Sequence, residues 1–456
     1  MSYSKFTIKN FRCFTDEQTL KFAQPVYGKI GSGITYIVGA NNSGKTTLLE
    51  GIWLRKDQKI KASERHGSGK PEFCLFDGSG ALKRKVFLIR EESYTLIADP
   101  NISNNEELFE VISSRRHWES AASSIGSTKD VLVSTITGQT PRKTQSLAVA
   151  SILMKIESDE EKYQQFIKLV KRVIPEFTKW AVAYEDNEYI EYISGNGVKH
   201  KTDYLGDGVI SVIRILAHLF EDNTTPLIID EPELSLHPLA QKKLIKLIAE
   251  FSQKRQIVLS THSPYFVAWE YINNGAKLNR ITKVNDNHSI IYQLEEPSNY
   301  ETLINGANWQ QPFLLDEVAK EIFFTNDNIL FLEGQEDVGL LRSEFSGDDI
   351  HIFGYGVRGC GNFKLALTMA KHLGFKKVGV ILDKGGEEDR IFSDLSSSFP
   401  EYKTIQWNKN DIRDKQSITS IEKFGYFNID GIKKDSEDLD DFNSKINAVK
   451  TYFQTV

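Results

Sequence analysis

The stretch that decides the fold is Gly39-Ala40-Asn41-Asn42-Ser43-Gly44-Lys45-Thr46. It follows an apolar run at 34–38 that predicts a strand, and helical spacing begins near Lys45. A glycine-rich turn between a strand and a helix directs backbone N–H groups and a helix N-terminus at one point, where they can cradle phosphates. An ordinary glycine-rich turn is the alternative. As a phosphate site, Lys45 would hold the β/γ oxygens, Thr46 would bind Mg²⁺, and the surrounding contacts would come from Gly39, Asn41, Asn42, Ser43, Gly44 and Thr47.

A second apolar strand carries acids at its end. Leu227-Ile228-Ile229-Asp230-Glu231 places two carboxylates at the C-terminal edge of a predicted parallel sheet, beside the loop that follows the first strand. Asp230 would hold the Mg²⁺ shell and Glu231 would polarise the attacking water. A third strand, 256–260, ends in Ser260-Thr261-His262-Ser263-Pro264. Three such strand ends together predict an ATP-hydrolysing site.

This series resembles the ABC-type ATPases, in the branch with RecF and SMC proteins, and Ile8-Lys9-Asn10-Phe11-Arg12 resembles how that branch begins. The resemblance implies that residues 235–238 are the D-loop and that His262 is the switch residue on the γ-phosphate. Leu205-Gly206-Asp207-Gly208 resembles a reduced signature loop, with a helix N-cap turn at Asp207 as the alternative. Because such a loop completes the site of a neighbouring subunit, the resemblance implies a homodimer or a higher even assembly.

A second alternation of strands and helices begins after residue 326 and predicts a small parallel sheet. Glu333 and Asp383 each follow an apolar strand, so both would face one crevice and could share a divalent cation. The layout resembles a Toprim domain, in which Glu333 and Asp383 would be catalytic metal ligands, with Asp337 or Glu336 and one of Glu387, Glu388 and Asp389 as further ligands. The Asp-x-Asp typical of Toprim domains is absent at 383–385. The resemblance also suggests a catalytic lysine, for which Lys415 is one candidate.

A competing motif lies in the same region. Gly354-Tyr355-Gly356-Val357-Arg358-Gly359 formally satisfies the dinucleotide fingerprint, with Asp383 downstream. The fingerprint should open its fold on the first strand, whereas here the first strand is 328–333. The glycines are therefore interpreted as a tight loop before a helix at 362–372, with Asn362 as its cap.

The predicted fold class is α/β: an ABC-type P-loop ATPase domain over 1–300, with an inserted helical or dimerisation region at about 57–200, then a linker at 301–325 and a Toprim-like domain over 326–456. The combination resembles the OLD family of ATP-dependent endonucleases. It implies ATP and Mg²⁺ as cofactors, with Mn²⁺ as an alternative nuclease metal, DNA as partner, and an anti-phage role with an RNA or protein partner. The alternative is an ATP-dependent DNA-binding sensor or scaffold with a degraded Toprim domain.

Composition limits the remaining classes. The chain has 456 residues, and 62 acidic against 56 basic side chains give a net charge of −6, so any DNA contact must come from a local patch or from metal-bridged phosphates. The three cysteines show no metal-ligand or paired spacing. No run approaches the roughly 20 apolar residues of a membrane helix, and the N-terminus lacks a signal-peptide apolar region. We therefore expect a cytoplasmic protein without a membrane partner.

Overall fold

The chain divides into residues 1–293 (unit 1) and residues 294–456 (unit 2). The computed structural model describes residues 2–54, 69–88, 96–99, 109–112, 151–184, 188–194, 197–201, 207–221, 225–285, 288–300, 319–325, 328–345, 350–415, 423–434 and 438–455. The linker expected at 301–325 and the Ser/Thr-rich sequence at 113–147 lie largely outside these residues.

Unit 1 is built on a six-stranded sheet in the order β14-β13-β3-β12-β11-β7. Five neighbouring strands run parallel, and β14 is antiparallel to β13. The bounds are β3 Ile34–Val38, β7 Glu110–Ile112, β11 Leu227–Asp230, β12 Ile257–Ser260, β13 Lys277–Asn285 and β14 His288–Gln293. Strands β3, β11 and β12 are buried along their whole length, which explains their continuous apolar sequences. The carboxyl ends of these three strands therefore meet at one edge.

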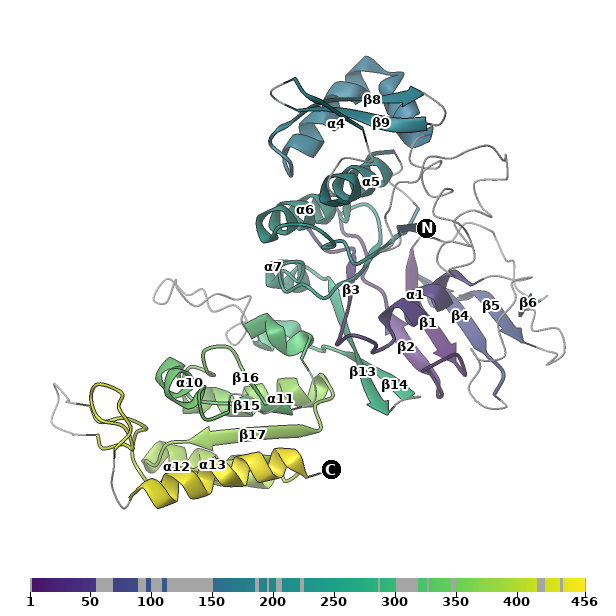
Figure 1. Ribbon diagram of the computed structural model, residues 1–456. Helices are drawn as coiled ribbons and strands as arrows, with labels where there is room; N and C mark the ends of the chain where they lie inside the picture. The colour runs from purple at the N-terminus through teal and green to yellow at the C-terminus, as the bar shows by residue number, and fades with distance from the viewer. Residues whose placement is uncertain are drawn as a thin grey trace. The chain divides into compact units, whose positions relative to one another are not determined.

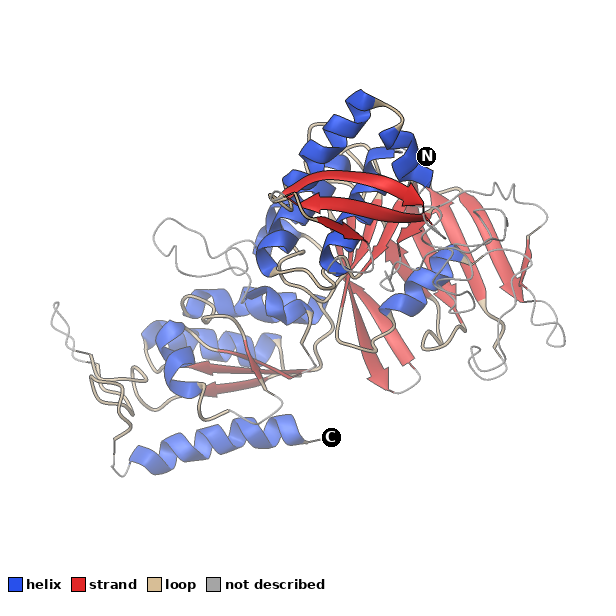
Figure 2. Cartoon of the chain, turned by 45° about the horizontal axis from the view of Figure 1, so that its top comes forward, coloured by secondary structure: helices blue, strands red, loops and turns tan. Residues whose placement is uncertain are grey.

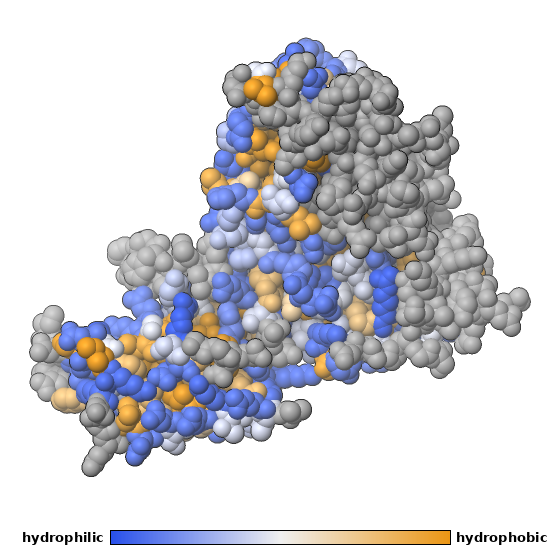
Figure 3. Space-filling model, viewed as in Figure 1, coloured by the Kyte–Doolittle hydropathy of each residue, from blue (hydrophilic) through white to orange (hydrophobic). Residues whose placement is uncertain are grey.

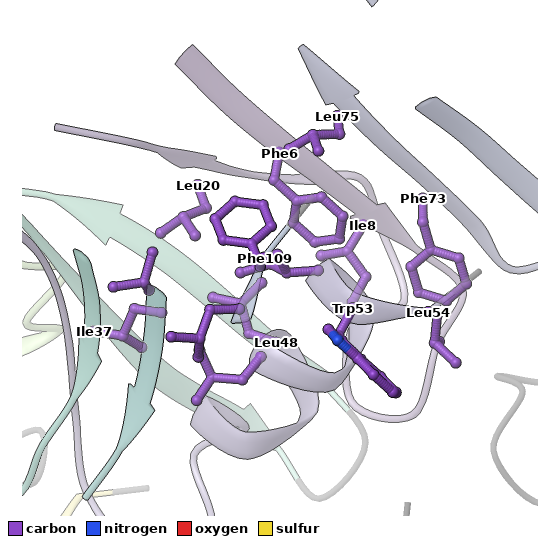
Figure 4. Close-up of a cluster of buried hydrophobic side chains, with 14 of the residues drawn as sticks. Phe6, Ile8, Leu20, Ile37, Leu48, Trp53, Leu54, Phe73, Leu75 and Phe109 are labelled. Carbon is purple, nitrogen blue, oxygen red and sulfur yellow. The ribbon is translucent and has the colours of Figure 1, made fainter. Parts of the chain in front are cut away.

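A second, antiparallel sheet covers the N-terminal part of unit 1 (Figure 1). It consists of β1 Tyr3–Lys9, β2 Gln18–Lys21, β4 Glu72–Asp77, β5 Leu82–Leu88 and β6 Leu96–Ala98. Helix α1, Lys45–Trp53, packs its apolar side chains among both sheets. Figure 4 shows this core, where Leu48 and Trp53 of α1 meet Phe6 and Ile8 of β1 and Ile37 of β3.

The structure differs from the expectation of one insertion over 57–200. Strand β4 pairs with β1, and β7 pairs with β11, so residues 72–112 supply strands to both sheets of the domain. Their contribution was hard to recognise because edge strands of three residues, such as β6 and β7, carry almost no periodicity. Strands β5 and β6 pair antiparallel at the edge of the second sheet.

A separate α/β layer follows in the chain. Helix α4, Glu160–Lys171, is capped by Asp159 and packs beside β8, Phe177–Tyr184, through a hydrogen bond of 2.6 Å from the Tyr163 hydroxyl to the Trp180 carbonyl. Strands β9, Glu188–Ser194, and β10, Lys199–Lys201, complete a three-stranded antiparallel sheet. Helices α5, Asp207–Glu221, α6, Pro238–Phe251, and α7, Trp269–Asn273, follow one another beside β3 in Figure 1. Figure 2 shows the helices in blue and the strands in red.

Unit 2 has a four-stranded, fully parallel sheet in the order β16-β15-β17-β18, as the alternation after residue 326 predicted. The strands are β15 Asn328–Phe331, β16 His351–Ile352, β17 Lys377–Leu382 and β18 Lys403–Gln406. The helices are α10 Gln335–Leu341, α11 Phe363–His372, α12 Gly386–Ser398 and α13 Asp438–Gln454. Strand order reverses between β15 and β17, and such a switch point is where open α/β sheets bind ligands.

No helix in the described parts of the chain combines the length and apolar character required to span a bilayer.

Candidate functional site

The glycine-rich loop of unit 1 closes tightly around Lys45. Gly39 and Gly44 have φ of 143° and 111°, and a Cβ on either would lie 2.3 Å from the Ile281 carbonyl oxygen or 2.6 Å from the Cys13 sulfur. Both positions therefore require glycine. The Lys45 ammonium donates to the carbonyls of Gly39 (3.0 Å) and Ala40 (2.9 Å), and burial lowers its pKa to about 8.

The rest of this loop is arranged around the start of α1. Asn41, Asn42 and Thr46 are exposed, Ser43 is buried, and the Thr47 side chain interacts with the Cys13 thiol. Thr46 is thus open to a ligand at the carboxyl edge of the sheet, whereas Thr47 turns toward the protein.

The predicted acids and the histidine meet beside this loop. Asp230 ends β11, Glu231 follows with a left-handed φ of 48°, and His262 follows β12, the strand between β11 and β3. The His262 Nε2 atom lies 3.5 Å from a Glu231 carboxylate oxygen. Burial and the neighbouring Lys45 charge lower the pKa of His262 to about 4, so the imidazole is neutral at neutral pH. A neutral imidazole beside a carboxylate can position a water or a phosphate oxygen.

Two positioning residues were missed by the sequence reasoning. Glu233 is partly buried, its carboxylate accepts from the His262 backbone N–H (2.5 Å), and burial raises its pKa. Gln241 of α6 accepts from the Ser263 hydroxyl (2.6 Å) and donates to the Leu236 carbonyl (2.8 Å). Together they connect the segment after β11 to the segment after β12. A second glutamate two residues after Glu231 was the only sequence signal for either.

The expected D-loop contacts the start of α5 within the same chain. A Cβ on Gly208 would lie 2.4 Å from the Ser235 carbonyl oxygen, so close packing of two backbones requires glycine there. Asp207 is the exposed first residue of α5. Gly206 lies outside the described residues, and the signature-loop role stays a prediction.

In unit 2, Glu333 and Asp383 follow β15 and β17, the adjacent strands of the switch point, and line one cavity of about 310 Å³. The Glu333 Oε2 and Asp383 Oδ1 atoms are buried and have no hydrogen-bond partner among the described residues. Burial, Asp337 and Glu388 raise the pKa of Glu333 to about 7. Burial, Asp337, Asp411 and Glu333 raise the pKa of Asp383 to about 8. This repulsion is of the kind a divalent cation relieves.

The further predicted metal ligands differ in whether they line the cavity. Asp337 lines the cavity, but one of its oxygens accepts from the Gly334 N–H (2.9 Å) at the start of α10, and burial raises its pKa to about 6. Glu387 is exposed in the first turn of α12 and does not line the cavity. Glu388, one residue on, comes within 4.8 Å of Glu333, since the helix turns that side chain toward β15. Neither acid is among the residues that line the cavity, and Glu388, one of the alternatives in this acidic run, is the one that comes near Glu333.

A buried carboxylate that no strand pattern indicated completes the cavity. Asp411 is 2% exposed and accepts from Lys415 (2.8 Å) and Lys423 (3.2 Å), which also line the cavity. Lys415 reaches Glu336 at 2.9 Å as well. Although burial opposes it, hydrogen bonding to these two carboxylates raises the pKa of Lys415, so the side chain is charged. Asp411 was missed because it lies in an irregular segment.

The glycine-rich stretch 354–359 holds Glu333 in place. Arg358 and Gly359 donate their N–H groups to the Glu333 carbonyl at 2.8 and 3.1 Å, and a Cβ on Gly356 would lie 2.8 Å from the Gly334 backbone. The glycines thus permit close approach of two loops, as the tight-loop interpretation expects. Asn362 occupies the N-cap position of α11, as expected, but its side chain makes no capping hydrogen bond and donates instead to the carbonyls of Val357 and Arg358.

Three comparisons place this geometry among known proteins. The family model described as "AAA domain, putative AbiEii toxin, Type IV TA system" matches residues 34–268. An OLD nuclease of Thermus scotoductus is 31% identical over 144 residues, which cover 30% of this chain and 26% of that protein. The chain therefore spans about a quarter of the length of this curated relative.

Solved SMC head domains are similar at low identity. The head domain from Thermotoga maritima has a TM-score of 0.37 at 14% identity, covering 65% of this chain and 100% of that chain. An SMC head with an extended coiled coil, bound to the C-terminal domain of ScpA from Pyrococcus furiosus, has a TM-score of 0.41 at 12% identity, covering 66% and 98%.

Proposed function

Because the chain belongs to the family of AAA domains described as putative AbiEii toxins of Type IV TA systems, we propose that unit 1 binds and hydrolyses ATP and that unit 2 cuts DNA with a divalent metal. The nucleotide part is supported by three adjacent strand ends that carry Lys45, Glu231 and His262. The nuclease part is supported by the carboxylate cavity and by the partial likeness to an OLD nuclease.

In unit 1 each residue of the nucleotide site would have a role that follows from its position. The Gly39–Thr46 loop and Lys45 would bind the triphosphate, Thr46 and Asp230 would hold Mg²⁺, and Glu231 would orient the attacking water. His262, held by Glu233 through its backbone, would sense the γ-phosphate. Binding of a triphosphate would replace the two carbonyl contacts of the Lys45 ammonium with charged oxygens.

In unit 2 the observation that carries the proposal is the pair of buried, unpartnered oxygens on Glu333 and Asp383 at a switch point. A phosphodiester is flanked by negative charge, and a divalent cation stabilises the transition state and activates water. Glu333, Asp383 and Asp337 would hold Mg²⁺ or Mn²⁺, with Glu388 as a further ligand. Lys415, charged between Asp411 and Glu336, would neutralise charge developing on the phosphate.

The direct test measures cleavage of plasmid DNA with Mg²⁺ or Mn²⁺ by wild type, Glu333→Ala and the control Glu387→Ala. The control removes an acid of the same unit that lies outside the cavity. We expect cleavage by wild type and the control, loss in Glu333→Ala, and ATP hydrolysis within about twofold in all three, since the acids belong to a separate unit. Equal cutting by wild type and Glu333→Ala would place the nuclease centre elsewhere.

The second candidate is a DNA-binding sensor whose unit 2 has lost catalysis. Lys384 and Gly385 follow Asp383, where Toprim domains typically carry a second acid, and this favours it. Absence of cutting by wild type in every divalent metal, together with ATP-dependent DNA binding, would make it the better account. An anti-phage role and an RNA or protein partner belong to the proposal only through the resemblance of the sequence motifs to the OLD family.

A further inference from the structure

The segment 408–434 of unit 2 combines charge and exposed apolar side chains beside the carboxylate cavity. It carries six basic and four acidic residues in a chain whose net charge is −6. Its described residues, 408–415 and 423–434, form the yellow loops that precede α13 in Figure 1, and their exposed large apolar side chains are Phe424, Ile429 and Ile432. Figure 3 shows hydrophobic groups interspersed with hydrophilic ones over unit 2.

Its lysines reach into the cavity from a fixed backbone. Lys415 and Lys423 pair as an antiparallel bridge, with N–H to O distances of 3.0 and 3.3 Å, and both ammonium groups contact the buried Asp411 carboxylate. One buried acid therefore presents two cations at the mouth of a site whose other lining acids would hold metal. Two cations and a metal ion suit the non-bridging oxygens of a phosphodiester strand.

Phe424 is exposed, whereas the neighbouring aromatic residues belong to the core of unit 2. Trp407, Tyr426 and Phe427 pack against Phe442 with ring centroids 5.4 to 5.7 Å apart, whereas Phe424 is 55% exposed. Burial of an aromatic ring stabilises a fold, so the exposed Phe424 ring does not contribute the stability that its buried neighbours Tyr426 and Phe427 do.

The backbone around Phe424 is held on both sides. Its N–H donates to Asn410 Oδ1 (2.9 Å), and the Gly425 N–H donates to Asp414 Oδ1 (3.0 Å). A Cβ on Gly425 would lie 2.3 Å from the Ile412 carbonyl, so the chain passes there only as glycine. The ring is thus displayed from a fixed position directly after Lys423.

A second exposed aromatic lies on the cavity itself. Tyr355, on the glycine-rich loop that packs against Gly334, is 37% exposed and lines the cavity together with Lys423. Exposed rings beside lysines that bind a backbone are the arrangement with which proteins hold unpaired bases, because bases stack on rings only when they are free of their partner strand. A paired duplex offers its phosphates to the lysines but keeps its bases stacked inside.

We propose that Lys423, Phe424 and Tyr355 form a binding site for single-stranded DNA at the cavity, so that unit 2 engages unpaired strands in preference to an intact duplex. The lysine neutralises the backbone and the two rings stack on bases that flank the phosphate in the cavity. This inference rests on the proposed nuclease function and specifies its substrate class.

The test measures fluorescence anisotropy of a labelled oligothymidylate and of a labelled duplex of equal length with the full chain, in Ca²⁺ at fixed salt. We expect tighter binding of the single strand, and Phe424→Ala should weaken that binding roughly 10-fold while changing duplex affinity less than about twofold. Phe424→Trp should retain single-strand affinity. Tyr27→Ala, which removes an 81% exposed ring in unit 1, is the matched control and should change neither affinity.

Equal affinity of wild type for the two DNAs, or unchanged single-strand binding in Phe424→Ala, would overturn the inference. Because binding in Ca²⁺ does not require cleavage, this result is independent of the nuclease test. Wild type that cuts duplex and binds both DNAs equally would leave the proposed function standing without this site. Wild type that binds single strands through Phe424 but never cuts would refute the nuclease and retain the site.

Discussion

Replacing Glu333 with glutamine should stabilise metal-free unit 2 at alkaline pH while it removes a metal ligand. The cavity raises the pKa of Glu333 from 4.5 to about 7, so its ionisation opposes folding. Because the folded pKa lies above the unfolded one, unit 2 has its full stability below pH 4.5, where Glu333 is protonated in both states. That stability is lost as the pH rises through 7. One pKa unit corresponds to 1.36 kcal/mol, so the loss at pH 8 is about 3 kcal/mol. A neutral amide of similar shape avoids it.

The assay is thermal unfolding in a chelator at pH 8 and pH 5. A gain of about 3 kcal/mol in a unit of this size corresponds to an increase in Tm of roughly 5–10 °C at pH 8, and the gain should fall to about 1 kcal/mol at pH 5. Mg²⁺ should raise the Tm of wild type at pH 8 more than that of Glu333→Gln. The control Glu387→Gln changes an exposed acid and should leave Tm within about 1 °C.

An unchanged or lower Tm of Glu333→Gln at pH 8, or an equal gain in Tm at pH 5, would contradict the raised pKa of Glu333 in the folded cavity.

The remaining predictions concern nucleotide, assembly and loop packing. Lys45→Ala should lose ATP binding in an equilibrium titration, and equal binding by wild type and Lys45→Ala would contradict the site. Glu231→Gln should bind ATP and hydrolyse it at least about 100-fold more slowly than wild type. Wild type should form a dimer or higher even assembly with ATP in sedimentation, and a strict monomer with full turnover would exclude a shared site. Gly356→Ala should destabilise unit 2 by about 2 kcal/mol, because its φ is 87° and its Cβ would meet the Gly334 backbone at 2.8 Å. Gly339→Ala, in α10 with nothing within 4 Å of its Cβ, should raise stability by about 0.5–1 kcal/mol in the same denaturant titration, and equal effects of the two alanines would contradict the packing.

The sequence alone was sufficient wherever one strand or one turn carries the chemistry. Val38 leads into a loop whose glycines tolerate positive φ, and apolar runs ending at Asp230, Ser260 and Leu382 predicted buried parallel strands because both of their faces are covered. Since carboxyl ends of parallel strands share an edge, the strand pattern predicted that Glu333 and Asp383 face one cavity, whereas the role of His262 in the nucleotide site came from the resemblance to ABC-type ATPases.

Only the tertiary structure decided which other side chains enter these sites. Glu387 and Glu388 are neighbours in one acidic run, and the rotation of α12 determines that Glu388 approaches Glu333. Asp411 and Lys423 belong to an irregular segment that is held by long-range hydrogen bonds to α13, so no local period could indicate them. Short edge strands such as β7 likewise form only because β11 presents its backbone groups to them. Local patterns therefore predicted the strand ends, whereas contacts between distant segments determined the remainder of each site.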